Sequence, residues 1–246
     1  MLLSKVERKC NERKDAISEF FQLFIDGISH LGANVITMSV KMRERNPQKS
    51  KQDILSAAEI LFAGKGIYGT RVDEIAHEAG INKRMNYEYF GSKEELYKAV
   101  LVEVYGRLGY KEVDILSDKT DPVDAIRKLI QFYFKFLKEN NTYVKLLQWE
   151  NLNEGKYIED EGFTGIKDPT LELLRKIINK GKEDGIFHSQ VDTEQVILSL
   201  LTFIFAYFSN RFTLSKLFGK RLDNDDNINK RIEHVTDMFL CYLLKE

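Results

Sequence analysis

Apolar residues recur at three- and four-residue spacing after Ser50, which predicts a helix with one buried face. Ser50 is a suitable N-cap for this first helix, and Gly64 and Gly66 are placed to end it. Thr70 is placed to cap a second, shorter helix. The buried faces consist of Ile54, Ala57, Ala58, Leu61 and Phe62 in the first helix and Val72, Ile75, Ala76 and Ala79 in the second.

A tight turn at residues 80–82 follows and leads into a third helix over roughly residues 83–89. Gly80 accepts a positive φ, and Asn82 is a suitable N-cap. A short helix, a glycine turn and another short helix form the helix-turn-helix pattern. In that pattern the helix after the turn reads the DNA major groove.

The two faces of the third helix differ in chemistry. Asn86 and Phe90 lie four residues apart and face inward, whereas Lys83, Arg84 and Tyr87 fall on the outer face. Cationic and phenolic side chains suit phosphates and base edges. The pattern alone fits equally well a small helical subdomain with an ordinary charged surface.

Capping signals predict further helices along the rest of the chain. Ser92 with Glu95 three residues later is a capping box, and an Asp-Pro pair combines a cap with a proline suited to the first helical position. These signals and the apolar spacing predict helices that begin near Ser92, Asp121, Thr142, Asp168, Asp192 and Ile228. The expected fold is therefore all-α.

The run from Val196 to Phe208 is strongly apolar and spans 13 residues. It is too short to cross a bilayer, and its composition predicts a helix buried on all sides. The helix that contains it is expected to run from Asp192 to about Phe218. With the final helix, over about residues 228–244, it makes two long apolar helices. Their periodicity fits either a subunit interface or burial within one chain.

Residues 1–41 contain an amphipathic aromatic run with three competing interpretations. Acidic residues interrupt the run, so it is neither a signal peptide nor a membrane span. It is an extra docking helix, a disordered arm, or upstream sequence foreign to the native protein, with Met42 as the true start. The basic segment at residues 43–51 is either an arm along the DNA or a flexible lead-in, which Pro47 keeps from joining the first helix smoothly.

Composition narrows the classes of function. The chain has 246 residues and a net charge of −1, so any surface for nucleic acid must be local. Cys10 and Cys241 lie at opposite ends, and the four histidines lack metal-ligand spacing. No nucleophile motif or glycine-rich cofactor fingerprint appears. We expect a cytoplasmic protein that is not an enzyme, with no cofactor, no metal site and no membrane partner.

Three ordered runs carry a more specific signal: ILSAAEILFAGKG, TRVDEIAHEAGI and YEYFGSKEEL. Together they resemble the DNA-binding domain of the TetR family of bacterial transcriptional regulators. One position departs from the family pattern, because Asn86 stands where Leu, Ile or Val is usual. The departure bears on how the reading helix packs. We expect either a local hydrogen bond that satisfies Asn86, such as one to a backbone carbonyl of the first helix, or a loosely packed reading helix.

The resemblance implies an all-α fold in two parts after the extension at residues 1–41. Residues 42–92 would form a three-helix helix-turn-helix DNA-binding domain, and residues 93–246 a helical ligand-sensing and dimerisation domain. In the family, each protomer contributes its last two long helices to a four-helix bundle at the dimer interface.

The resemblance also implies site residues. The positions of Thr70, Tyr87 and Lys93 hold operator phosphates in the family, and those of Lys83 and Arg84 lie at the groove; Tyr89 completes the DNA-binding set. Among the aromatic residues, plain core packing competes with a ligand pocket, and Glu150 is either a partner for a cationic effector or a surface carboxylate. The ligand-binding candidates are Phe132, Phe136, Tyr143, Trp149 and Glu150, and the dimer-interface candidates are Phe203, Tyr207, Ile232, Val235, Phe239 and Tyr242.

The implied function is that of a homodimeric repressor that a small-molecule effector releases from a near-palindromic operator in double-stranded DNA. An activator and an effector-independent regulator are alternatives within DNA binding. Because of Asn86, a helical interaction protein with a weakened DNA-binding head is the alternative from another class. Neither the effector nor the operator sequence follows from the amino-acid sequence.

Overall fold

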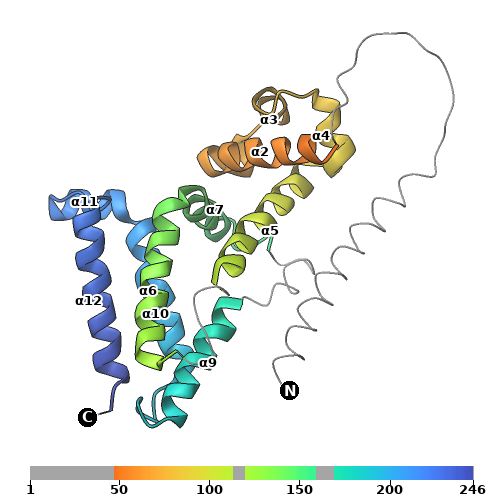
Figure 1. Cartoon of the computed structure of the whole chain (residues 1–246). Coiled ribbons are helices and arrows are strands. Elements are labelled where there is room, and N and C mark those ends of the chain that lie inside the picture. Colours follow the sequence, from red (N-terminus) through yellow and green to blue (C-terminus); the bar gives the residue numbers. More distant parts are fainter. Residues whose placement is uncertain (1–46, 113–119, 159–168, 246) are drawn as a thin grey trace, which may run out of the picture. The chain divides into compact units, whose positions relative to one another are not determined.

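The computed structural model describes residues 47–112, 120–158 and 169–245, which form ten α-helices (Figure 1). Within these ranges the only β feature is an isolated antiparallel bridge between Phe187 and Leu244. The all-α prediction is confirmed. The extension at residues 1–41, Asp168 and most of the loop before it lie outside the described residues. The helices are α2 (Pro47–Gly69), α3 (Val72–Glu78), α4 (Lys83–Phe90), α5 (Lys93–Glu112), α6 (Pro122–Glu139), α7 (Asn141–Leu152), α9 (Pro169–Glu183), α10 (Thr193–Ser209), α11 (Arg211–Phe218) and α12 (Asp225–Leu243).

Helix α2 begins at Pro47, so the predicted N-cap at Ser50 is wrong. Ser50 is buried inside the helix, and Pro47 occupies the first helical position, where its missing N–H costs nothing. Pro47 was expected to keep the basic segment from joining the first helix smoothly, but it starts the helix, and residues 47–51 of that segment belong to α2. The predicted end is nearly right, because Gly66 leaves the helical path with φ 67° and ψ 175° before the last turn runs to Gly69.

Helix α3 is capped by Arg71, and the prediction that Thr70 caps it is wrong. The backbone N–H of Arg71 donates to the side chain of Glu74 at 3.2 Å, which is one half of a capping box, since the arginine side chain has no acceptor for the other half. The hydroxyl of Thr70 instead donates to the carbonyl oxygen of Gly66 at 2.8 Å. Thr70 thus ties the start of α3 back onto the break in α2.

Several other predicted caps are confirmed. Asp121 accepts hydrogen bonds from the backbone N–H groups of the first turn of α6, and Asp192 does the same for α10. The hydroxyl of Ser92 accepts from the backbone N–H of Glu95 at 3.0 Å at the start of α5. These caps depend on residues within three positions of one another, so the sequence alone reveals them.

Helix α5 continues the hydrophobic core from the helix-turn-helix into the later helices. Its buried residues Leu96, Tyr97, Val100, Leu101 and Val104 belong to one cluster with residues of α2 and α6. Helix α6 packs against α9, α10 and α12, and α2 packs against both α5 and α7. Helices α2, α3 and α4, called the head below, are thus joined to the rest through α5 and α7.

The helix predicted from Asp192 to about Phe218 is two helices in the structure, so the prediction of one continuous helix is wrong. Helix α10 ends at Ser209, and α11 leaves it at an angle of 75°. The side chain of Asn210 donates to the carbonyl oxygen of Ala206 at 3.1 Å and so competes with continuation of the helix. The expectation that α10 is buried on all sides is also wrong, because Leu198 is 60% exposed.

None of the described helices is, by itself, both long and apolar enough to be a candidate membrane span. The bent pair of α10 and α11 passes the same test on length and composition when the two helices are taken together.

Candidate nucleic-acid interface

The outer face of α4 presents the cationic and phenolic side chains that the sequence predicts for a DNA-reading helix. Asn82 caps this helix, because its side chain accepts a hydrogen bond from the backbone N–H of Arg84 at 2.9 Å. Gly80, with φ 64°, makes the turn before it. Lys83, Arg84 and Tyr87 are all exposed, so the structure brings three of the six predicted DNA-binding residues onto one open face.

Carboxylates of the head hold the two cations of this face. Lys83 Nζ lies 2.9 Å from an oxygen of Asp73 on α3, and this hydrogen bond raises the pKa of Lys83. Arg84 Nε lies 2.8 Å from an oxygen of Glu88, one turn along α4. Exposed ion pairs contribute little to stability, so phosphates or base edges can replace these carboxylates at small cost.

Thr70 and Lys93 meet at the point where the chain enters α3. Lys93 Nζ donates to the carbonyl oxygen of Thr70 at 3.3 Å. Thr70 is only 1% exposed and its hydroxyl points inward, so in this conformation that hydroxyl does not face a phosphate. Tyr89 is half-buried and packs against the core, unlike Tyr87.

Asn86 faces the core of the head, as its spacing predicts, and is 3% exposed. Its Nδ2 donates to the carbonyl oxygen of Val72 on α3 at 3.4 Å, which is a long hydrogen bond. The prediction of a partner on the first helix is therefore wrong. Its Oδ1 is buried and has no hydrogen-bond partner among the described residues. An unsatisfied buried amide oxygen destabilises the folded head.

We expect Asn86→Ile to raise the free energy of unfolding by about 1–3 kcal/mol, because it removes this unsatisfied oxygen. The gain should appear in thermal or urea unfolding without DNA, since the effect belongs to the packing of α4. Sequence preference for DNA should stay the same. An unchanged stability together with loss of sequence preference would contradict this account and would make Asn86 a base-reading residue.

The predicted ligand-binding residues fall into two groups. Phe132, Phe136 and Tyr143 form one aromatic cluster, in which the Phe136 and Tyr143 rings meet edge to face at 5.2 Å between centroids. Phe136 and Tyr143 are buried and belong to the hydrophobic core. Trp149 and Glu150 lie near the other end of α7.

Trp149 covers the break in α2. Its Nε1 donates to the carbonyl oxygen of Ala63 at 3.4 Å, and a Cβ added to Gly66 would lie 2.8 Å from Cε3 of its ring. This contact attaches the head to α7.

Glu150 is 1% exposed, so the interpretation as a surface carboxylate is wrong. One carboxylate oxygen accepts from the backbone N–H of Tyr157 at 3.2 Å, and the other has no partner within the described part of the chain. The hydroxyl of the fully buried Tyr97 is likewise unpartnered there. Burial raises the pKa of Tyr97, and the nearby Glu150 adds to that rise.

The predicted dimer-interface residues fall into an exposed group and a buried group. Phe203 is 40% and Tyr242 59% exposed, so both are available to a partner. Tyr207, Val235 and Phe239 are buried within the chain itself, which corrects their assignment to an interface. Ile232 is half-buried. The spacing placed these residues on apolar helices but did not show which side of each helix the protomer itself covers.

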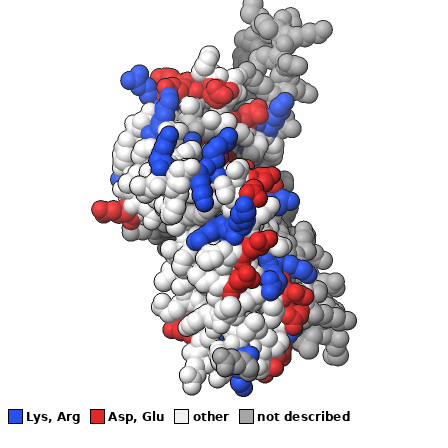
Figure 2. All heavy atoms as spheres, turned by 90° about the vertical axis from the view of Figure 1, so that its left-hand side faces the viewer, with Lys and Arg blue, Asp and Glu red and all other residues white. Residues whose placement is uncertain are grey.

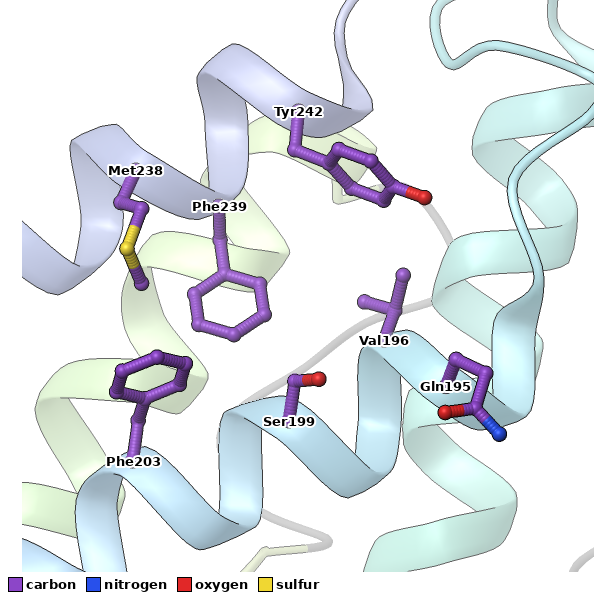
Figure 3. A pocket seen from close by; sticks show the side chains of 7 residues that line it. All are labelled: Gln195, Val196, Ser199, Phe203, Met238, Phe239 and Tyr242. Atoms are coloured by element: carbon purple, nitrogen blue, oxygen red, sulfur yellow. The ribbon is translucent and has the colours of Figure 1, made fainter.

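An apolar groove of about 270 Å³ lies between α10 and α12 (Figure 3). Its lining residues are Gln195, Val196, Ser199, Phe203, Met238, Phe239 and Tyr242. Figure 2 looks at the side of the molecule on which α12 lies in Figure 1 and shows a broad uncharged area there. Sequence reasoning missed Leu198 and Met238, which are exposed on the same two helices. The sequence feature that could have identified them is an apolar residue that lies outside the buried face of its own helix.

No group of three or more metal-ligating side chains occurs in the described ranges.

Comparison with known proteins gives the family directly. Residues 54–100 match the model for bacterial regulatory proteins of the tetR family, and residues 122–239 match the tetracyclin repressor-like C-terminal domain. The chain is 28% identical over 205 residues to the HTH-type transcriptional repressor NicS of Pseudomonas putida, covering 83% of this chain and 97% of that protein. It is 27% identical over 154 residues to the repressor KstR2 of Mycolicibacterium smegmatis, covering 61% of this chain and 73% of that protein.

Solved structures show the same fold. The fatty acid degradation regulator FadR from Bacillus halodurans aligns with a TM-score of 0.63 and 21% identity, over 80% of this chain and 97% of that one. The ketosteroid regulator KstR2 of Mycobacterium tuberculosis aligns with a TM-score of 0.61 and 20% identity, over 86% and 100%. The helix-turn-helix with its open α4 face, the two family models and these relatives agree, and the chain belongs to the TetR family of helix-turn-helix transcriptional regulators.

Proposed function

We propose that the protein is a homodimeric repressor that binds a near-palindromic operator and leaves it when a small-molecule effector binds. The observation that carries the proposal is the open face of α4, where Lys83, Arg84 and Tyr87 stand clear of the core. A two-fold dimer would place two such helices in successive major grooves about 34–36 Å apart. Repressors named among the relatives support this role.

The α10 and α12 face supports the dimer. Phe203, Met238 and Tyr242 expose large apolar side chains at the groove between the two helices, and Leu198 is exposed on α10 as well. Contiguous exposed apolar surface of this kind is typical of a protein–protein interface. Homodimers are also typical of the family.

The residues of the head have separate roles in this proposal. Tyr87 and Lys93 bind phosphates, because a phenol and an ammonium at the edge of the head suit the backbone of the duplex. Lys83 and Arg84, at the start of α4, read base edges. Thr70 acts through its carbonyl oxygen, which holds the amine of Lys93, and through its buried hydroxyl, which fixes the Gly66 break.

A paired substitution in α4 tests the proposal. Arg84→Ala should reduce the preference for operator over random DNA by about 1–3 kcal/mol, because it removes a base contact. Tyr87→Phe should weaken binding to both DNAs equally, by up to about tenfold, because it removes one hydrogen bond to a phosphate. Gel-shift titration at one fixed salt concentration, on the DNA upstream of the protein's own gene and on random DNA, measures both.

Two results would count against the proposal. Equal losses on both DNAs for Arg84→Ala would remove base reading from α4. Failure of the wild-type protein to bind any DNA would favour the helical interaction protein, in which the poorly satisfied Asn86 has weakened the head.

A further inference from the structure

Glu59 is a buried carboxylate at the contact between the head and the helices that follow it. It lies on α2 and is 7% exposed. Its two oxygens accept hydrogen bonds from Nη1 and Nη2 of Arg107 on α5, at 2.9 and 2.5 Å. The hydroxyl of Thr142, at the start of α7, also donates to it. One side chain of the head is therefore held by two helices outside the head.

The arginine of this cluster is itself held in place. Arg107 Nη2 also donates to Glu103, one turn earlier on α5, at 3.0 Å. The same oxygen of Glu103 accepts from Nε2 of Gln52 on α2 at 3.0 Å. The hydrogen bond to Glu59 raises the pKa of Arg107, so the guanidinium stays charged. The cluster thus fixes the geometry of the guanidinium as well as its charge.

A second contact between α2 and α7 lies seven residues further along both helices. Gly66 follows Glu59 by seven positions, and Trp149 follows Thr142 by seven. Trp149 packs over Gly66 and donates to Ala63. Seven residues span roughly 10 Å of helix. Two contacts at that separation fix the direction of α2 along α7, whereas one contact would leave a pivot.

Stability alone is a poor explanation for the polar contact. The buried carboxylate of Glu59 loses most of its hydration, whereas the side chain of Arg107 stays 35% exposed. Well-packed apolar residues in place of a buried charge pair are often equally stable. What the bidentate pair and the hydroxyl add is directional geometry. This matters at Glu59 because the head must face DNA at one defined angle.

We propose that Glu59 is a positioning residue for DNA binding, whose bonds to Arg107 and Thr142 hold the head at the angle that sets the separation of the two α4 helices in the dimer. This inference rests on the proposed dimeric repressor. Loosening the contact leaves each α4 able to read its half-site. The same loosening removes the preference of the dimer for one distance between the two half-sites.

The test compares Thr142→Val with Thr142→Ser, and adds Glu59→Gln. Valine keeps the shape of threonine without the hydroxyl, and serine keeps the hydroxyl. The DNA probes are the wild-type binding site from upstream of the protein's gene, the same site with one base pair added or removed between half-sites, and a single half-site. One base pair moves the half-sites by about 3.4 Å.

Wild type and Thr142→Ser should prefer the native spacing. In Thr142→Val and Glu59→Gln that preference should fall about tenfold, with half-site affinity within about twofold of wild type. An unchanged spacing preference in both variants, with or without a lower thermal midpoint, would overturn the inference and leave the cluster a purely structural role. A wild-type protein that binds no DNA, or that binds as a monomer, would instead overturn the proposed function and the inference with it.

Discussion

Replacing Leu198 with Asp should convert the proposed dimer to a monomer of 28.7 kDa and abolish tight operator binding. Leu198 is 60% exposed on α10, so the substitution leaves the protomer's own core intact. In a two-fold dimer the change occurs twice, and each unpaired carboxylate in an apolar interface costs about 3–5 kcal/mol. The dissociation constant should therefore rise by at least about 1,000-fold.

Sedimentation velocity over a dilution series measures this change, and Ile60→Asp is the matched control. Ile60 is 58% exposed on α2, so it tests an Asp at an equally exposed apolar position outside the α10 and α12 face. Ile60→Asp should remain dimeric. If Leu198→Asp also remains dimeric, the subunits meet through another surface. Phe239 is less suitable for this test, because it is 5% exposed and its loss would damage the protomer.

The contrast between Leu198 and Phe239 shows what the sequence could and could not predict. Both lie in helices that the spacing predicts, although α10 ends at Ser209 and not near Phe218. Which residues face the protomer's own core depends on how α6, α9 and α12 pack around α10, and that information is not local. The exposed side of α10 therefore became visible only in the folded chain.

Local signals predicted local features well. Asn82, Asp121 and Asp192 cap helices because each cap needs only a side chain and an N–H two or three residues away. Ser50 failed as a cap because Pro47 offered an earlier start that also suits the first turn. Thr70 failed as the cap of α3 because its hydroxyl donates to the carbonyl oxygen of Gly66, and Arg71 occupies the N-cap position.

The attachment of the head was the least predictable part. Glu59 and Arg107 are 48 residues apart, and Glu59 and Thr142 are 83 apart. In the sequence, Glu59 reads as one more surface charge on an amphipathic helix. Only tertiary packing brings α5 and α7 to it, so no spacing rule could pair these residues.

Gly66→Ala should be the most destabilising alanine substitution at a glycine of α2. Gly66 has φ 67° and ψ 175°, a conformation open to glycine and costly for other residues by about 1–3 kcal/mol. A Cβ there would also lie 2.8 Å from Cε3 and 2.9 Å from Cδ2 of Trp149. The ring would have to move, so we expect a total loss of about 2–4 kcal/mol in the free energy of unfolding.

Urea unfolding measures the loss, and Gly64→Ala is the matched control in the same helix. Nothing lies within 4 Å of a Cβ at Gly64, so alanine should stabilise the protein there by about 0.5–1 kcal/mol through its higher helix propensity. Adding Trp149→Ala to Gly66→Ala separates the two causes. If the ring contact contributes, the double variant should be more stable than the sum of the single losses predicts. Equal stability of Gly66→Ala and Gly64→Ala would mean that α2 can run straight through Gly66, and that Trp149 does not hold the head at this point.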